Sequence, residues 1–271
     1  MMKTILLTGA TDGIGYETAK LLAREGHRLL LHGRSAEKLA RLKESLGAQA
    51  DVDTYRADLS RLSEVRELAA AITQSVSTLD VLINNAGVYA TAHPITPEGF
   101  DVRFIVNTIA PYVLTESLLA LMPATGRVIN LSSAAQAPVD VGALLGKRAL
   151  SQGDAYAQSK LAITMWSYHM ARERGAGGPA VIAVNPGSLL GTKMVRDAYG
   201  TSGKDLAIGA NILHRAALSD EFGDASGRYF DNDRGAFGRA HPDADDPAKH
   251  RALIGAMKQV IGAFDGQDAS A

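Results

Sequence analysis

Short apolar runs without polar alternation recur along the chain, separated by longer stretches in which apolar residues repeat at helical spacing. The runs cover residues 5–7, 29–31, 81–83, 128–131 and 181–184. Such runs are typical of strands that are buried on both faces of a parallel sheet. Between two of them, Val65, Leu68 and Ile72 follow the period of a helix face. The alternation of strands and helices predicts an α/β fold with right-handed crossovers.

Length and composition permit one globular domain and disfavour several functional classes. The 271 residues carry 28 basic and 29 acidic side chains, so the chain lacks the charge excess of a nucleic-acid-binding or membrane-surface protein. The absence of cysteine excludes disulfides, thiolate metal sites and thiol nucleophiles. No Pro/Gly-rich linker divides the sequence, and residues 1–10 are too short an apolar segment for a signal peptide or a membrane span. We expect a single domain over residues 1–271, in the cytoplasm, with no nucleic acid and no membrane as partner.

Two segments break the alternation, residues 134–153 after the fifth strand and residues 188–203 after the sixth. Loops at the carboxyl ends of strands form the ligand crevice of an open α/β sheet. Their apolar side chains predict a pocket for a lipophilic or aromatic molecule, and packing of the same side chains on the domain is equally open. They are Val139, Val141, Leu144, Leu145 and Leu150 in the first loop, and Leu189, Leu190, Met194, Val195 and Tyr199 in the second.

The remaining segments are expected to complete the fold. Long helices are predicted around residues 100–122 and 154–174, and a last strand at 227–231. Residues 231–250 are polar and contain several glycines and prolines, which favours an ordered surface loop. His241 and the acidic residues near it set no ligand geometry, so we expect no metal. Residues 266–271 are expected to fray.

A glycine-rich turn with the sequence TGATDGIG lies at residues 8–15, between the first strand and the first helix. Glycines at such a turn let the backbone approach a pyrophosphate at the helix N-terminus, where free N–H groups point at the anion. The spacing is not that of the common G-x-G-x-x-G fingerprint, so the turn alone is also compatible with a purely structural role. The residues expected to contact a dinucleotide here are Gly9, Thr11, Asp12, Gly13, Ile14 and Gly15.

Five motifs in order make the chain resemble the short-chain dehydrogenase/reductase family over nearly its whole length. They are the T-G-x-x-x-G-x-G turn, Asn84-Asn85-Ala86-Gly87 with Asn107 after it, Ser133, Tyr156-Ala157-Gln158-Ser159-Lys160, and Pro186-Gly187. The resemblance implies a doubly wound parallel sheet of Rossmann type, with about seven strands in the order 3-2-1-4-5-6-7 and helices on both faces. It also implies a nicotinamide cofactor and a catalytic set of Asn107, Ser133, Tyr156 and Lys160.

The residue types of this set agree with the chemistry that the resemblance implies. Tyr156 and Lys160 are four positions apart on a predicted helix, so their side chains project from one face. A free phenol has a pKa of about 10, and an adjacent ammonium lowers it, which suits Tyr156 for acid–base chemistry. By resemblance, Lys160 also binds the nicotinamide ribose and Ser133 hydrogen-bonds the substrate oxygen. Ser132 is expected to be a structural hydroxyl.

The separation of Ser133 and Tyr156 is longer than the usual family spacing, which implies an insertion in the 134–153 loop. Similar insertions occur in branches that resemble retinol dehydrogenases. Pro111, four residues after Asn107, has no N–H to bond the Asn107 carbonyl, so the helix is expected to bend there. By resemblance, that carbonyl would hold a water of a proton relay to Lys160 and the tyrosine, with the Asn107 side chain holding the kink. A kink that serves only packing is the alternative.

The residues after the second strand predict the choice of cofactor. Residues 32–35 contain no carboxylate to accept a hydrogen bond from a ribose 2′-hydroxyl, whereas Arg34 and Ser35 offer donors for a 2′-phosphate. We therefore expect NADP(H), with an exposed arginine at a helix start as the alternative. The resemblance adds further contacts to the dinucleotide from Asp58, Leu59, Asn85, Ala86, Gly87, Pro186, Gly187, Leu189 and Thr192. Thr192 stands one residue later than the family's threonine, a place that Gly191 takes here.

These observations favour an NADP-dependent oxidoreductase that acts on a small-molecule carbonyl or alcohol. The resemblance allows a homo-oligomer, because family relatives are often dimers or tetramers, although those resembling retinol dehydrogenases can be monomers. A dinucleotide-binding regulator without turnover is one alternative, because fold alone does not establish activity. Such proteins commonly lose the tyrosine or the lysine, and both are present here. A relative of nucleotide-sugar epimerases or dehydratases is a weaker alternative, since too little chain follows Gly187 for their substrate domain.

Overall fold

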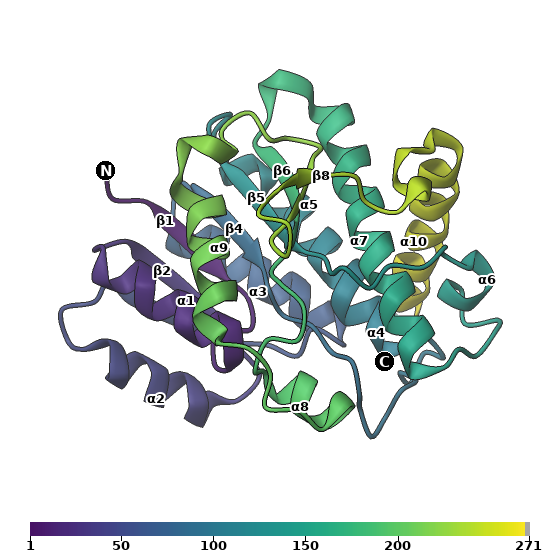
Figure 1. Cartoon of the computed structure of the whole chain (residues 1–271), viewed down its shortest axis with the longest axis horizontal. Coiled ribbons are helices and arrows are strands. Elements are labelled where there is room, and N and C mark those ends of the chain that lie inside the picture. Colours follow the sequence, from purple (N-terminus) through teal and green to yellow (C-terminus); the bar gives the residue numbers. More distant parts are fainter. Residues whose placement is uncertain (269–271) are drawn as a thin grey trace.

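The computed structural model describes residues 1–268, without the side chains of residues 198, 199, 267 and 268. Its centre is a sheet with the strand order β3-β2-β1-β4-β5-β6-β7-β8 (Figure 1). The first seven strands are parallel, and β8 pairs antiparallel with β7. The strands are β1 (Thr4–Leu7), β2 (Arg28–Gly33), β3 (Val52–Arg56), β4 (Val81–Asn84), β5 (Arg127–Leu131), β6 (Ala180–Asn185), β7 (Tyr229–Asp231) and β8 (Ala236–Gly238).

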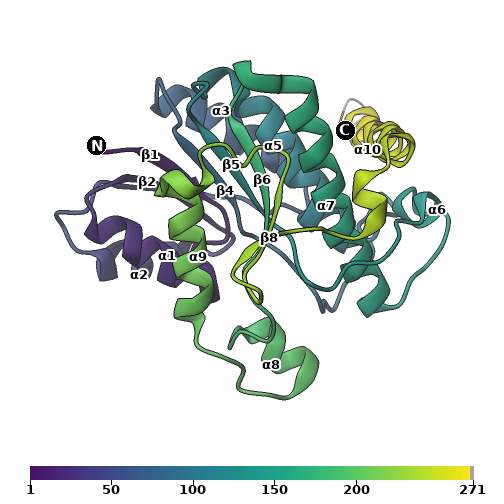
Figure 2. The same ribbon diagram turned by 45° about the horizontal axis from the view of Figure 1, so that its top comes forward.

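Helices cover both faces of the sheet (Figure 2). Alternate strand residues point to opposite faces, so Ile5 and Leu7 pack with α1, α2 and α9, whereas Leu6 packs with α3, α5 and α7. The predicted doubly wound parallel sheet is confirmed. The helices are α1 (Gly13–Arg24), α2 (Ala36–Leu46), α3 (Leu62–Ser75), α4 (Val102–Phe104), α5 (Ala110–Leu118), α6 (Val141–Leu144), α7 (Gln152–Arg174), α8 (Lys193–Tyr199), α9 (Leu206–Leu218) and α10 (Pro247–Asp268).

The C-terminal part differs from the sequence prediction. The segment 231–250, expected to be a loop, contains β8, a 3-10 turn at Pro242–Asp245 and the start of α10. Helix α10 packs on α3, α6 and α7 as an outer layer, and the ring of Phe264 stacks on that of Phe100 with centroids 5.7 Å apart. The apolar residues Leu253, Met257, Val260 and Phe264 stand at helical spacing, a signal that predicts this helix. Of the tail expected to fray, residues 266–268 belong to α10 and the rest lies outside the described residues.

The two loops contain helices that were not expected, and the long central helix is less regular than expected. Helix α6 lies in the segment 134–153 and α8 in the segment 188–203. The helix predicted at 100–122 is α4, a π-helical turn at Ile105–Ile109, α5 and a 3-10 turn at Leu119–Leu121. Among the described helices, Val102–Leu121 alone is long and apolar enough to cross a membrane, with a mean hydropathy of 1.5, and 67% of the stretch tested is buried inside the fold.

A chain of buried polar side chains ties two central strands to two helices. Asn84 of β4 donates to Asn130 of β5 at 2.8 Å and to Thr115 of α5 at 3.1 Å. Asn130 in turn donates to the hydroxyl of Ser167 on α7 at 2.8 Å. All four residues are at most 2% exposed, so water does not reach their polar groups. Each group therefore needs the hydrogen bond that it makes within the protein. This series of hydrogen bonds fixes the position of α7, which carries Tyr156 and Lys160.

We predict that Ser167→Ala lowers the free energy of unfolding by about 1–3 kcal/mol, because the Asn130 amide loses its acceptor inside the core. Urea denaturation followed by circular dichroism measures the change. Ser117→Ala is the matched control, since both hydroxyls also donate to the carbonyl four residues earlier but Ser117 is exposed. The control should change stability by less than about 0.5 kcal/mol. Equal changes in the free energy of unfolding for the two substitutions would contradict a structural role for these buried hydrogen bonds.

Candidate active site

The glycine-rich turn joins β1 to α1 at the carboxyl edge of the sheet and approaches the segment after β4 closely. A Cβ atom on Gly15 would lie 2.2 Å from the carbonyl oxygen of Gly9, and one on Gly9 would lie 2.9 Å from the Cα of Ala86. Gly9 and Gly13 both have positive φ angles, of 65° and 53°. The side chain of Asp12 caps α1 by accepting from the Gly13 N–H at 2.8 Å. Thr11 and Ile14 lie in the same turn and at its exit.

Asn85, Ala86 and Thr8 hold this turn in place. The Asn85 amide donates to the carbonyls of Thr8 at 2.9 Å and Gly9 at 3.1 Å. The Thr8 hydroxyl accepts from the backbone N–H groups of Asn85 and Ala86. The side chain of Asn85 is therefore occupied within the protein, which leaves the backbone of this segment for the dinucleotide contact that the resemblance implies.

His32 supports the same turn and was not expected from the sequence. Its Nδ1 accepts from the Gly9 N–H at 3.3 Å, and its Nε2 lies 3.0 Å from the carbonyl oxygen of Ala57. Burial lowers the pKa of His32, which keeps the imidazole neutral with the proton on Nε2. A polar residue at the end of a buried strand is the signal that could have identified it.

Arg34, Ser35, Asp58 and Leu59 follow the neighbouring strands β2 and β3. Arg34 is exposed, whereas the Ser35 hydroxyl accepts from the Lys38 N–H at 3.2 Å as the N-cap of α2. Asp58 accepts from the backbone and hydroxyl of Ser60. The side chain of Leu59 is 3% exposed and belongs to the core, so only its main chain is available to a ligand.

Lys160 and Tyr156 lie on α7, one helical turn apart. The Lys160 ammonium donates to the Leu131 carbonyl at the end of β5 at 2.7 Å, and it lies 5.6 Å from the ring centroid of Tyr156. Burial lowers the pKa of Lys160 to about 8. A proton at this nitrogen is therefore easier to release than from an exposed lysine.

The two serines after β5 have different surroundings. Ser132 is 3% exposed, and its hydroxyl bonds to Thr164 at 2.7 Å and the Lys160 carbonyl at 3.1 Å, which agrees with a structural role. Ser133 is half-buried, and its hydroxyl accepts from the Ala135 N–H at 3.1 Å. The orientation of Ser133 thus leaves its O–H able to donate elsewhere.

Two residues behind Ser133 were missed by the sequence analysis. The Ser133 carbonyl accepts from the Gln136 amide at 2.9 Å and from the Tyr229 hydroxyl at 3.0 Å. Burial raises the pKa of Tyr229, which therefore stays protonated and a donor. Gln136 lies in the inserted loop and Tyr229 on β7, so no spacing rule links them to Ser133.

Asn107 lies in the π-helical turn, four residues before Pro111. The helix is thus distorted where the proline predicts, and single π turns are frequent at functional sites. The Asn107 side chain accepts from the Val88 N–H at 2.8 Å and donates to the Val88 carbonyl at 2.9 Å and to Ser159 of α7 at 3.0 Å. These bonds connect the segment after β4 to α7, and the role of the side chain in holding the kink stays a prediction.

Residues 186–192 form a loop that returns to the glycine-rich turn. Gly187 has a φ of 120° and Leu189 a φ of 55°. A positive φ at a residue other than glycine is strained, and such strain is typical of functional loops. Asp233 after β7 accepts from the backbone and hydroxyl of Ser188, so the hairpin anchors the loop. The Thr192 hydroxyl caps α8 by accepting from Val195, and its methyl group faces Gly13.

The apolar residues of the two loops divide between core and surface. In the first loop, Leu144 is fully buried, and Val139, Val141, Leu145 and Leu150 are partly buried and pack against the core, as the packing alternative expects. In the second, Leu190 is 2% exposed while Leu189 is 47% exposed. The side chain of Tyr199 lies outside the described residues.

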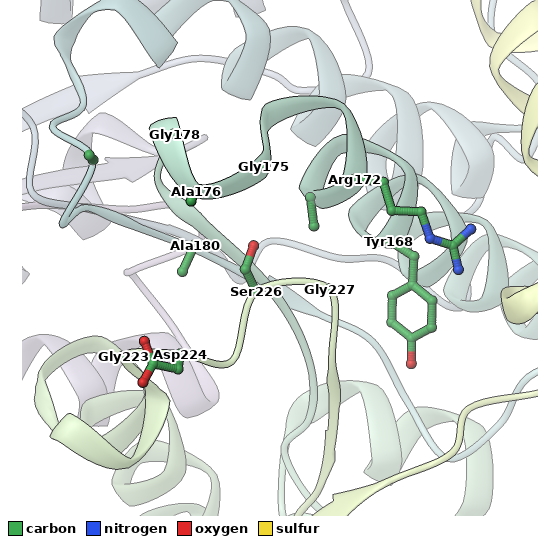
Figure 3. A pocket seen from close by; sticks show the side chains of 12 residues that line it. Tyr168, Arg172, Gly175, Ala176, Gly178, Ala180, Gly223, Asp224, Ser226 and Gly227 are labelled. Carbon is green, nitrogen blue, oxygen red and sulfur yellow. The ribbon is translucent and has the colours of Figure 1, made fainter.

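One surface hollow lies away from these residues. It has a volume of about 590 Å³ and is lined by Tyr168, Arg172 and small residues around Gly227 (Figure 3). Ala180 begins β6 and Gly227 precedes β7, so the hollow is at the amino edge of the sheet, opposite the carboxyl edge that carries Lys160. It takes no part in the candidate site.

The carboxyl edge fits a dinucleotide at two places. At the glycine-rich turn, Gly9, Gly13 and Gly15 carry no side chains, and the N-terminus of α1 supplies N–H donors. At Gly87, a Cβ would lie 3.6 Å from the Lys160 nitrogen and 3.4 Å from the Asn107 side-chain oxygen. A glycine therefore keeps the space beside Lys160 open for a bound group.

Comparison with known proteins gives relatives over most of the chain. Human retinol dehydrogenase 13 is 34% identical over 96% of this chain and 85% of its own length. The structure of an uncharacterised protein from Mycobacterium paratuberculosis matches with a TM-score of 0.79 and 27% identity, over 97% of this chain and 93% of that one. The landomycin C-6 ketoreductase LanV, solved with bound NADP and rabelomycin, matches with a TM-score of 0.67 and 29% identity, over 85% of this chain and 94% of its own.

The family model described as short chain dehydrogenase matches residues 3–202. This range contains the glycine-rich turn, the segment after β4, and all of Asn107, Ser133, Tyr156 and Lys160. Members of this family bind a nicotinamide dinucleotide. The chain belongs to the short-chain dehydrogenase/reductase family and is similar to its retinol dehydrogenases.

Proposed function

We propose that the protein is an NADP(H)-dependent oxidoreductase that interconverts a lipophilic or aromatic carbonyl compound and its alcohol. The observation that carries the proposal is the buried Lys160 ammonium, which lies 5.6 Å from the Tyr156 ring and beside the opening at Gly87. A regulator that only binds a dinucleotide has no need of a buried charge next to a tyrosine. The outcome of the first test below separates the two functions.

The chain's residues would act in the following way during reduction. Tyr156 donates its hydroxyl proton to the substrate oxygen, and Ser133 donates a hydrogen bond to the same oxygen. The positive charge of Lys160 stabilises the phenolate that Tyr156 becomes. When bound, the cofactor supplies the hydride. The Asn107 main-chain carbonyl would hold a water that returns a proton toward Lys160.

NADP(H) is proposed over NAD(H) because of the charge beside β2. Arg34 is exposed and Lys38 stands one helical turn further on, with Asp12 across from it at 3.4 Å. No carboxylate occupies residues 32–35 to repel a 2′-phosphate. The NADP bound to the similar ketoreductase LanV supports the same choice.

The proposed substrate class rests on exposed apolar side chains near the end of β6 and on the names of similar proteins. Leu189 is 47% and Ile208 is 42% exposed. Leu189 follows Gly187 by two residues, and a Cβ on Gly187 would lie 3.7 Å from the Ile208 side chain. The names of the similar retinol dehydrogenase and of the ketoreductase with bound rabelomycin indicate lipophilic and aromatic substrates for those proteins. The cytoplasmic location stays a prediction from the sequence.

We predict that the purified protein oxidises NADPH in the presence of members of a ketone, aldehyde and quinone panel, and that Tyr156→Phe lowers kcat by about 10²–10⁴-fold. The dissociation constant for NADPH should change less than about twofold, because only the hydroxyl is removed. Tyr168→Phe, on the same helix but at the opposite edge, is the control and should keep full turnover. A wild type that binds NADPH but reduces no compound of the panel would favour the non-catalytic binder instead.

Lys160→Met should abolish turnover and leave the cofactor-free protein at least as stable at pH 7. The pKa of Lys160 falls from 10.5 to about 8 by burial, which corresponds to roughly 3 kcal/mol against the charged folded state. Loss of the bond to the Leu131 carbonyl offsets part of this gain.

The pH dependence of stability tests the same buried charge. The folded protein releases the Lys160 proton near pH 8, whereas the unfolded chain keeps it to about pH 10.5, so wild-type stability rises relative to the Met variant across this interval. Urea denaturation of both proteins at pH 7 and pH 10 measures the difference. A stability difference that is the same at both values would contradict a lowered pKa.

Arg34→Glu should weaken NADPH binding by at least about tenfold and leave NADH binding the same or tighter, because a carboxylate repels a 2′-phosphate. Fluorescence titration of both reduced cofactors measures the ratio of dissociation constants. Arg251→Glu makes the same charge change on α10 and serves as the control. Tighter binding of NADH than of NADPH by the wild type would overturn the cofactor assignment.

A further inference from the structure

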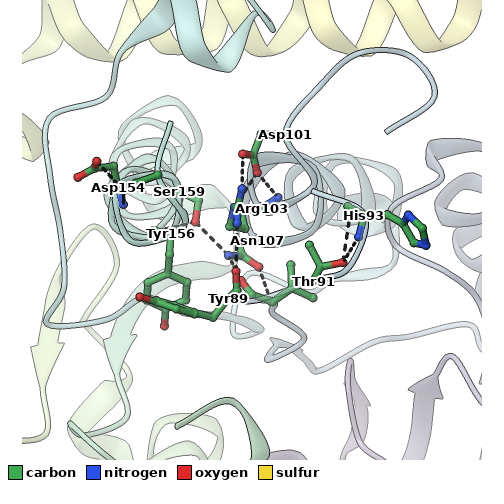
Figure 4. A network of polar contacts seen from close by, with 11 residues as sticks. Tyr89, Thr91, His93, Asp101, Arg103, Asn107, Asp154, Tyr156 and Ser159 are labelled. Carbon is green, nitrogen blue, oxygen red and sulfur yellow. Dashed lines mark hydrogen bonds and ion pairs between the residues drawn. The ribbon is translucent and has the colours of Figure 1, made fainter. Parts of the chain in front are cut away.

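Tyr89 lies in the segment after β4 and packs its ring against that of Tyr156. The ring centroids are 5.0 Å apart with an angle of 58° between the planes, and both side chains are half-buried (Figure 4). The Tyr89 hydroxyl reaches the start of α7, where a Cβ on Gly153 would lie 3.5 Å from it. One flank of the Tyr156 ring is therefore covered by a second aromatic ring.

The backbone under Tyr89 is held on both sides. The Asn107 side chain bonds to both the N–H and the carbonyl of Val88, the residue before it. Arg103 donates to the carbonyl of Tyr89 itself at 3.3 Å. The ring is thus attached to a segment whose main chain has little freedom to move.

Arg103 is an unusual group to find under a loop, because its side chain is 2% exposed. Its guanidinium makes two bonds to the carboxylate of Asp101, Nε to Oδ1 at 2.8 Å and an Nη to Oδ2 at 2.6 Å. The remaining Nη is the one directed at Tyr89. A planar fork held at two points presents its other donor in a defined direction, which a lysine could not do.

A buried ion pair of this kind is weak evidence for stability, since apolar residues of similar volume often serve a core as well. What the Asp101–Arg103 pair adds is a direction for the Tyr89 carbonyl. The pair also lies at the start of α4, immediately before the π-helical turn that carries Asn107. One short stretch of chain therefore supplies both clamps on the Val88–Tyr89 backbone.

We propose that Tyr89 is a specificity-determining residue whose ring forms a wall for a planar, conjugated group next to the reacting carbonyl, and that Arg103 is the positioning residue that sets this wall. The inference rests on the proposed function, because it places the carbonyl at Tyr156. A flat group bonded to that carbonyl would extend past the Tyr156 ring and pack against the ring of Tyr89. Aromatic pairs of this kind favour an aryl over a saturated ring by roughly fivefold to tenfold.

The test compares two ketones that differ only in the ring, acetophenone and cyclohexyl methyl ketone, with NADPH as reductant. Tyr89→Leu should lower the ratio of kcat/KM values, aryl over saturated, by about tenfold, mainly through a higher KM for acetophenone. Tyr89→Phe keeps the ring and should keep the ratio within about twofold. An unchanged ratio in Tyr89→Leu would overturn the proposal.

Calorimetric binding of the two ketones to the protein saturated with NADP⁺ separates this inference from the proposed function. If the wild type binds acetophenone better and Tyr89→Leu loses the preference, the wall exists even where neither ketone is reduced. In that case the proposed reaction fails and the inference stands. If the wild type binds both ketones equally, or binds neither, the inference fails whatever the turnover.

The positioning role of Arg103 is tested with the double replacement Asp101→Asn plus Arg103→Met, which removes both charges together and leaves no unpaired ion. The aryl preference should fall toward that of Tyr89→Leu. Adding Tyr89→Leu to the double replacement should produce no further loss, because the pair acts through the ring. Independent, additive losses would overturn the positioning role.

The exposed pair of Glu116 and Arg174 provides the matched control, and its neutralisation with Glu116→Gln and Arg174→Met should leave the preference as in the wild type. Thermal melting of each variant shows whether it is folded. Should the Asp101–Arg103 replacement fail to fold, Arg103→Lys keeps the charge but loses the fork, and retention of the full aryl preference in that variant would equally refute the role.

Discussion

The buried ammonium of Lys160 is the group on which the arrangement of the site depends. A charge out of water needs a partner, and the partner here is the Leu131 carbonyl at the end of β5, 2.7 Å away. That bond requires the strand and α7 to meet at one place, and the chain of Asn84, Asn130 and Ser167 holds them there. The same burial lowers the pKa of Lys160 to about 8. The buried position therefore costs folding free energy and at the same time suits the amine for proton transfer.

Polar side chains in this protein mostly hold backbone, and only a few remain for ligands. His32, Asn85 and Gln136 use their donors and acceptors on the main chain of the turns that they support. Asn107 does the same for Val88 and thereby connects the segment after β4 to α7. The turns at the carboxyl edge are therefore rigid although they lack secondary structure, which is what orientation of a reacting group demands.

Helix α10 shows why the outer layer escaped prediction while the inner layers did not. The inner helices alternate with strands, and the alternation itself identifies them. The segment before α10 is rich in polar residues, glycine and proline, which predict a loop. It nevertheless contains β8 and a 3-10 turn, and a helix with a regular apolar face follows. That face packs on α3, α6 and α7, which are distant in the sequence, so its partners could not be inferred locally.

The sequence by itself determined the parallel sheet, the order of its motifs and the family, because buried strands must be apolar and a turn that approaches a cofactor must be glycine. It also placed Tyr156 and Lys160 on one helix face through their spacing. Only the tertiary structure decided which residues of different elements are in contact. Tyr229 and Arg103 donate hydrogen bonds to the carbonyls of Ser133 and Tyr89, and the Tyr89 ring packs against that of Tyr156. These contacts join residues whose separation in the chain carries no period, and they depend on how the ends of different strands meet at one edge of the sheet.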